Sequence, residues 1–253
     1  MSITRKDFLR NLKWTAAGAT VGAPIGALGL NRLNSTRENW ETESFSQSGE
    51  DVIVNFILGY LHMAANMTYL DVGAFHPTKL SNTYYFYRGG RRGVLVEPNV
   101  DMTELLRTVR PNDVTLVAGI GVTDQREADY YIMTDPACNT FSKEEAEHTE
   151  RVTNRWTRIR EVRKIPLLNI NDVMQERFGR GPTFLSVDTE GLDLAILKSI
   201  DYQRYRPTVI CAETLVSGTR KTVAEIPEFM ATQGYTVRGQ TFVNTIFVDS
   251  RFL

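Results

Sequence analysis

Two carboxylates follow expected β-strands at the spacing of one strand–helix–strand repeat. Asp71 precedes Gly73 at the end of an apolar run, and Glu97 closes the run 93–97, 26 residues after Asp71. The carboxyl ends of neighbouring parallel strands face the crevice in which open α/β sheets bind ligands. An acid after the first strand can hold a ligand's ammonium group there. An acid after the second can accept both ribose hydroxyls of an adenosyl cofactor.

A third acidic turn follows the apolar residues 184–187, where Asp188 and Glu190 precede Gly191. If this strand neighbours the first, Asp188 lies beside the reacting group of the ligand. Asp188, Glu190 and His76 are the catalytic candidates because carboxylates and histidine can act as general bases. The two acids could also share Mg²⁺ or cap a helix, and His76 could simply hydrogen-bond its own loop. We do not expect a metal.

The first turn lacks the glycine pattern of dinucleotide-binding sheets. Phe75 occupies the second glycine's place in G-x-G-x-x-G, so the turn has no glycine-lined cradle for a pyrophosphate. This counts against NAD and FAD. Taken alone, D-V-G-A is also the pattern of a plain tight turn between a strand and a helix.

Strand and helix patterns alternate from residue 45 onward and predict a three-layer α/β sandwich. Strands are expected at 67–72, 93–97, 113–118, 183–188, 208–213, 235–238 and 244–248, and helices at 52–61, 81–88, 100–109, 192–200 and 222–233. The last two strands are joined by only a few residues and must pair antiparallel. A Rossmann-like, mostly parallel seven-stranded sheet with a C-terminal hairpin is the layout of methyltransferases that use S-adenosylmethionine.

Residues 135–166 interrupt this rhythm and are expected to form a helical insertion. Ser142 and Glu145 fit a capping box, and acids early in the helix precede a basic run. The basic residues are Arg151, Arg155, Arg158, Arg160, Arg163 and Lys164. Two interpretations stay open: a solvated helix face, or a lid over the acceptor whose arginines clamp a phosphate or carboxylate.

Residues 1–43 are separated from the expected domain, 44–253. Basic residues precede the uncharged run 14–30, and the segment around Lys6 resembles a twin-arginine export signal that lacks its second arginine. The run is slightly short for a spanning helix, so a membrane anchor, an export signal and a mobile tail all stay open. We expect a cytoplasmic domain, either free or anchored to the inner membrane through 14–30, and favour export less.

Composition argues against nucleic-acid binding and against a fold built on cysteine-bound zinc or on disulfides. A net charge of −1 provides no overall field that attracts nucleic acid. Cys138 and Cys211 lie far apart and cannot by themselves form a zinc site or a disulfide framework.

Six segments in order resemble the FkbM family of S-adenosylmethionine-dependent methyltransferases. They are F-S-Q-S-G-E-D at 45–51, the stretch 69–99 with S-N-T-Y at 81–84, T-F-S-K-E-E at 140–145, and the stretches 184–200, 205–210 and 244–248. The resemblance implies a class I methyltransferase fold with S-adenosylmethionine as cofactor. It also implies O-methylation of a hydroxyl on a saccharide, glycolipid or natural-product acceptor.

The resemblance assigns roles residue by residue. Asp71 and Gly73 correspond to the first cofactor motif, Glu97 to the ribose-binding acid, and Asp188 with Glu190 to the motif that borders the acceptor. Asp188 also counts as a cofactor-binding candidate, together with Ala74, Asn82, Asn99, Gly119 and Ile120. Two other functions stay open: a nucleotide-cofactor oxidoreductase and a non-catalytic, membrane-tethered binding module.

Overall fold

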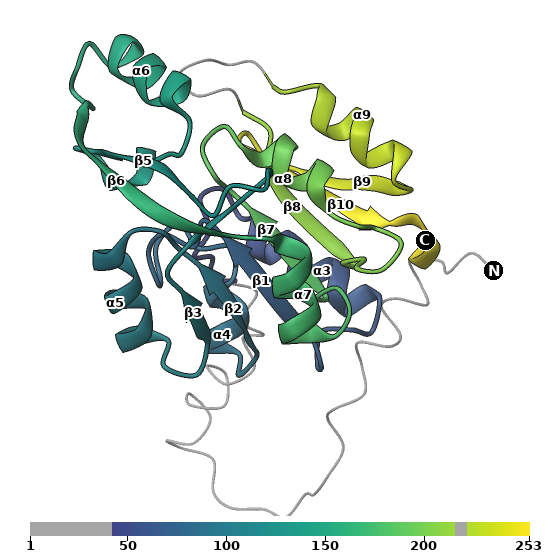
Figure 1. The fold of residues 1–253 in the computed structure, drawn as a ribbon. Helices are drawn as coiled ribbons and strands as arrows, with labels where there is room; N and C mark the ends of the chain where they lie inside the picture. Colours follow the sequence, from purple (N-terminus) through teal and green to yellow (C-terminus); the bar gives the residue numbers. More distant parts are fainter. Residues whose placement is uncertain (1–41, 216–221) are drawn as a thin grey trace, which may run out of the picture. The chain divides into compact units, whose positions relative to one another are not determined.

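The computed structural model describes residues 42–215 and 222–253 (Figure 1). The predicted anchor or signal at 14–30 lies outside the described residues. Within the described part, no helix is both long enough and apolar enough to cross a membrane.

Seven strands form one sheet in the order β3-β2-β1-β7-β8-β10-β9. They are β1 (Thr68–Val72), β2 (Arg92–Val96), β3 (Val114–Leu116), β7 (Phe184–Val187), β8 (Val209–Glu213), β9 (Tyr235–Gln240) and β10 (Asn244–Asp249). All neighbours pair parallel except β10, which is antiparallel to both β8 and β9. This confirms the predicted mostly parallel sheet with an antiparallel C-terminal pair, and it confirms that the strand before Asp188 neighbours the strand that carries Asp71.

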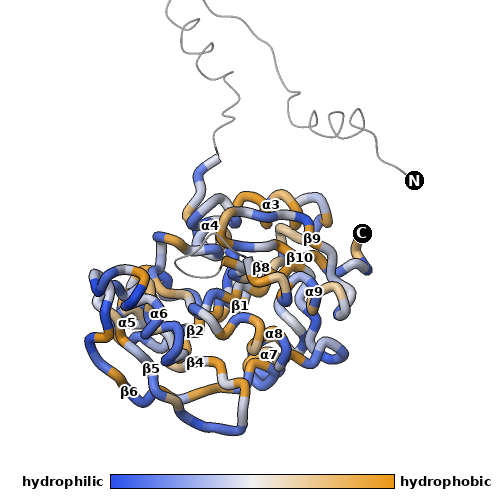
Figure 2. The backbone as a smooth tube through the Cα atoms, turned by 90° about the horizontal axis from the view of Figure 1, so that it is seen from above, coloured by the Kyte–Doolittle hydropathy of each residue, from blue (hydrophilic) through white to orange (hydrophobic). Residues whose placement is uncertain are grey.

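Helices cover both faces of the sheet (Figure 1). One face carries α3 (Glu50–Tyr60), α4 (Tyr84–Arg88) and α5 (Val100–Val109), and the other carries α7 (Ile170–Phe178), α8 (Asp193–Ser199) and α9 (Glu225–Thr232). Side chains alternate along β1, so Tyr69 packs in the first core and Leu70 in the second. Figure 2 shows hydrophobic and hydrophilic residues alternating along the helices, and the buried hydrophobic residues of strands and helices form the two cores.

The insertion departs from the prediction. Only α6 (Lys143–Val152) and the short η1 (Pro136–Cys138) are helical, whereas β6 (Ile159–Leu168) is a strand between β4 (Gly119–Ile120) and β5 (Glu127–Met133). The expectation of a helix throughout 135–166 is therefore wrong beyond Val152. Asn154 and Arg155 adopt positive φ, which ends the helical path, and β6 then pairs antiparallel with β5.

Three smaller differences from the prediction concern one strand boundary, one missed helix and one helix cap. The strand expected at 113–118 is shortened to β3, and β4, which follows it, pairs with β6 instead of joining the large sheet. The helix α7 was not predicted. The capping box is half formed, because the Ser142 hydroxyl accepts the Glu145 N–H at 3.2 Å while the Ser142 N–H donates to Thr140.

Gly73 lies where the turn after β1 touches the turn after β7. Its φ is +84°, and a Cβ added there would overlap the carbonyl oxygen of Asp188. The two turns are joined by a 3.0 Å hydrogen bond from the Asp188 N–H to the carbonyl of Val72. Only glycine combines this backbone conformation with so close an approach.

Replacing Gly73 with alanine should therefore destabilise the fold much more than the same change at Gly49. Gly49 also has a positive φ, +91°, but a Cβ there would meet nothing within 4 Å. We expect Gly49→Ala to cost about 1–2 kcal/mol of unfolding free energy through backbone strain alone. Gly73→Ala should exceed that cost by at least about 2 kcal/mol, because the clash is added to the strain. Urea denaturation measures both variants, and equal losses would contradict the close approach.

Candidate active site

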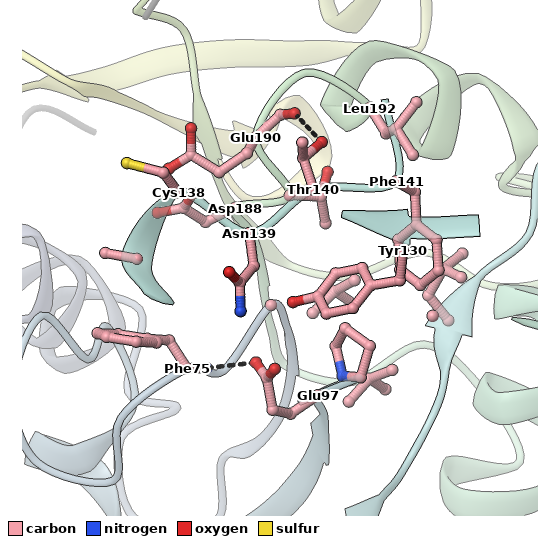
Figure 3. Close-up of a pocket in the computed structure, with 18 of the residues that line it drawn as sticks. Phe75, Glu97, Tyr130, Cys138, Asn139, Thr140, Phe141, Asp188, Glu190 and Leu192 are labelled. Carbon is pink, nitrogen blue, oxygen red and sulfur yellow. Dashed lines mark hydrogen bonds between the residues drawn. The ribbon is translucent and has the colours of Figure 1, made fainter. Parts of the chain in front are cut away.

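A cavity of about 260 Å³ opens at the carboxyl ends of β1, β2 and β7. Figure 3 shows side chains from these turns and from the insertion converging on it. Six predicted site residues line this cavity: Gly73, Glu97, Gly119, Ile120, Asp188 and Glu190. The sheet topology thus brings together Glu97 and Glu190, which are separated by 93 positions in the sequence.

Glu97 is buried at one end of the cavity and held by two backbone donors. Its Oε2 accepts the Phe75 N–H and its Oε1 accepts the Asn99 N–H, both at 2.8 Å. Burial raises the pKa of Glu97 to about 7, although these two hydrogen bonds oppose the rise. Each carboxylate oxygen keeps a lone pair, so Glu97 can accept two further hydrogen bonds from a ligand.

Asp71 points away from the cavity, into the layer of α3, α4 and α5. Its carboxylate accepts the hydroxyl of Thr83, which in turn accepts a 3.0 Å hydrogen bond from the fully buried Arg110. Arg110 also pairs with Asp113 at 2.8 Å. Burial raises the pKa of Asp71, and the Thr83 hydroxyl and the Arg110 charge partly offset the effect. Asp71 is not among the residues that line the cavity.

Four other predicted residues also lie outside the lining. Ala74 belongs to the core beneath α3–α5, and Asn82 donates to the hydroxyl of Ser186. The Asn99 side chain caps α5. The Nδ1 atom of His76 accepts the N–H groups of Thr78 and Lys79, both at 3.1 Å, so this nitrogen is engaged within its own loop.

The other end of the cavity is acidic. Carboxylate oxygens of Asp188, Glu190 and Glu213 lie within 4.8 Å of one another. Burial, and then the nearby carboxylates, raise the pKa values of Asp188 and Glu213. A cluster of this kind can retain a proton at neutral pH, donate or accept one during a reaction, or bind a hard cation through oxygen.

The strand β5 and the insertion supply a wall whose residues were not among the predicted site residues. Its lining side chains include Tyr130 of β5 and, from the insertion, Cys138, Asn139, Thr140 and Phe141. The Phe141 ring packs against Gly119, where an added Cβ would clash with the ring. Thr140 and Phe141 stood in one of the resembling segments, which was the only sequence signal for this wall.

The basic residues after α6 do not reach this cavity. None of the six residues Arg151, Arg155, Arg158, Arg160, Arg163 and Lys164 lines it, and all six are exposed. Arg163 pairs with Glu161, and Lys164 pairs with Asp129. The structure therefore favours the solvated-surface interpretation of these charges over the lid interpretation.

The methyltransferase FkbM domain family matches residues 71–237, about two thirds of the chain. The chain belongs to this family. It is an S-adenosylmethionine-dependent methyltransferase, and its sheet has the order and the antiparallel C-terminal pair of the class I fold. None of the curated proteins matches the chain.

Solved structures with a similar fold include three methyltransferases. A putative caffeoyl-CoA O-methyltransferase from Staphylococcus aureus is 9% identical, with 88% of this chain and 91% of that chain covered and a TM-score of 0.43. An O-methyltransferase from Bacillus cereus in complex with SAH is 11% identical, with coverages of 87% and 86% and a TM-score of 0.41. A TehB-like SAM-dependent methyltransferase from Corynebacterium glutamicum is 7% identical, with coverages of 88% and 95% and a TM-score of 0.41. Likeness at this level carries no argument about the substrate.

The lining residues fit S-adenosylmethionine. Gly73 borders the cavity without a side chain that would fill it, and Glu97 offers two acceptors suited to the two ribose hydroxyls. Asp188 and Glu190 provide negative charge at the end where a sulfonium would be favourable.

Cofactor binding should therefore depend on pH through Glu97. Above pH 7 the ionised carboxylate accepts two ribose hydroxyls, and below pH 7 protonation removes part of this capacity. We expect S-adenosylhomocysteine, whose sulfur is uncharged, to bind up to about tenfold more weakly at pH 6 than at pH 8. Calorimetric titrations of the wild type and of Glu97→Gln measure the effect. An unchanged pH dependence in Glu97→Gln would contradict the assignment.

Proposed function

We propose that the chain transfers the methyl group of S-adenosylmethionine to a hydroxyl group of a saccharide, glycolipid or natural-product acceptor. The observation that carries the proposal is the cluster of Asp188, Glu190 and Glu213. Figure 3 places Asp188 and Glu190 at the end of the cavity away from Glu97. A cofactor held by its ribose at Glu97 would direct its sulfonium toward these acids. The choice of a hydroxyl acceptor rests on the FkbM resemblance.

Positioning is the main requirement of this reaction. The sulfonium is already an activated electrophile, so the chain must hold the acceptor oxygen in line behind the methyl carbon at near-attack distance. A neutral hydroxyl is a poor nucleophile, and a base that removes its proton would accelerate the attack. Asp188 and Glu190 are the residues that we assign to this role.

The charge of the cluster suits such a transfer. Mutual repulsion and burial favour a proton on the cluster in the absence of a cation. A nearby sulfonium would favour the ionised, basic form. Transfer of the methyl group would neutralise the sulfonium, and the cluster would take up the hydroxyl proton. The net charge of the site is then the same before and after the reaction.

The same oxygens could hold Mg²⁺, although the proposed reaction requires no metal. If bound Mg²⁺ acted as a Lewis acid on the acceptor hydroxyl, a chelator would slow the transfer. We expect EDTA to leave the rate unchanged.

Neutralising either assigned acid should slow the reaction without removing the cofactor. We expect Asp188→Asn and Glu190→Gln to lower the rate of methyl transfer by about 10²–10⁴-fold. Affinity for the uncharged S-adenosylhomocysteine should change only a few-fold. Glu225→Gln, at an exposed position in α9, provides a control with the same loss of one carboxylate. Transfer at the wild-type rate in both acid variants would contradict the role of the cluster.

The acceptor class can be tested with S-adenosylmethionine that carries a radiolabelled methyl group. The full chain is incubated with matched panels of saccharides, glycolipids and polyhydroxylated natural products, and with amine analogues of the same scaffolds. We expect label in an alkali-stable ether. Label on the amine analogues alone would refute the hydroxyl acceptor. Cofactor binding without any labelled product would favour the binding-module alternative.

A further inference from the structure

The side-chain amide of Asn139 is a buried donor without an acceptor. Asn139 is 9% exposed, and its Oδ1 accepts the N–H of Met133 at 2.8 Å. This bond fixes the orientation of the amide, because turning it over would bring its NH₂ group against the N–H of Met133. Nδ2 is therefore the free end. It is shielded from solvent and makes no hydrogen bond within 3.5 Å among the described residues, although the Tyr130 hydroxyl is close enough for the amide to offset part of the rise that burial causes in the pKa of that tyrosine.

The segment that carries Asn139 is held on both sides. Asp135 caps η1 by accepting the Ala137 N–H at 3.1 Å. Tyr131 and Thr140 exchange two backbone hydrogen bonds of 2.8 and 3.2 Å. The Thr140 hydroxyl also donates to the carbonyl of Glu190 at 2.8 Å, which joins the insertion to the turn after β7. The amide nitrogen is thus held in place by its surroundings.

Figure 3 shows this nitrogen directed into the cavity, toward the space between Glu97 and Tyr130 and away from Asp188 and Glu190. A buried donor without a partner costs about 1–3 kcal/mol, so a polar occupant that offers an acceptor would remove this penalty. Since Glu97 can receive hydrogen bonds at the same end, the two side chains present one donor and one acceptor to the same part of a ligand.

We propose that Asn139 is a cofactor-binding residue that donates a hydrogen bond to the adenosyl half of S-adenosylmethionine. A ribose oxygen and an adenine ring nitrogen are both acceptors of the required kind. The inference rests on the cofactor site described above and adds a contact from the insertion to those from the sheet. The insertion then serves the cofactor, whereas the arginines after α6 lie outside the cavity.

Calorimetric titration of the full chain with S-adenosylhomocysteine tests this contact. Asn139→Asp keeps an acceptor for the Met133 N–H but replaces the free donor with an oxygen, and Asn139→Ala removes both groups. We expect each variant to bind about 10- to 100-fold more weakly at pH 8, which follows from the loss of one buried hydrogen bond. Asn169→Asp is the control. It introduces the same charge at an exposed helix cap outside the cavity, and its affinity should equal that of the wild type.

A second ligand locates the contact within the cofactor. 5′-Deoxy-5′-methylthioadenosine retains the adenine and the ribose but lacks the amino-acid part, so its binding should weaken by the same factor. A loss confined to S-adenosylhomocysteine would place the contact on the amino-acid part and overturn the adenosyl assignment. Wild-type affinity in folded Asn139→Asp and Asn139→Ala would overturn the contact itself. If the wild type failed to bind S-adenosylhomocysteine, that result would contradict the proposed cofactor site itself, and the Asn139 contact would be overturned with it.

The kinetics of methyl transfer give an independent readout. A contact to the adenosyl half is made equally before and during the reaction, so its loss should raise KM for S-adenosylmethionine and leave kcat nearly unchanged. A loss of kcat with unchanged KM would instead assign Asn139 to the acceptor or to the reacting atoms.

Discussion

The backbone contact between Gly73 and the carbonyl of Asp188 determines where this site forms. It requires β1 and β7 to be neighbours, and it requires a residue without a side chain at the first turn. Because the two turns touch, the acidic turn after β7 and Glu97 after β2 border one cavity. The insertion completes the enclosure through the bond from Thr140 to the carbonyl of Glu190.

Acids beneath the helices α3–α5 and acids at the cavity are stabilised in different ways. On the face of α3–α5, the Thr83 hydroxyl and the charge of Arg110 support Asp71. On the cavity side, no lysine or arginine of the described residues lines the space around Asp188 and Glu190. A positively charged cofactor would supply the missing charge. The carboxylates without a cationic partner therefore lower the stability of the ligand-free protein, and the same carboxylates are electrostatically complementary to a sulfonium.

The parallel sheet and its acidic turns could be predicted because their signals are local. A buried strand that ends in an acid is recognisable within a few residues, as at Glu97 and Asp188. Two features needed the structure. The alternation of side chains along β1 directs Asp71 away from the cavity. The pairing of β5 with β6 depends on contacts between distant residues, while the charges on β6 resembled those of a helix surface. The buried donor of Asn139 is positioned by contacts with β5, and it had no sequence signature of its own.

An electron-density map of the full chain crystallised with S-adenosylhomocysteine tests the central claim most directly. The account predicts density in the cavity between Glu97 and Asp188, with the ribose hydroxyls at the Glu97 carboxylate and the sulfur facing Asp188 and Glu190. Ligand bound elsewhere with this cavity left empty, or bound with its ribose at the acidic cluster, would contradict it.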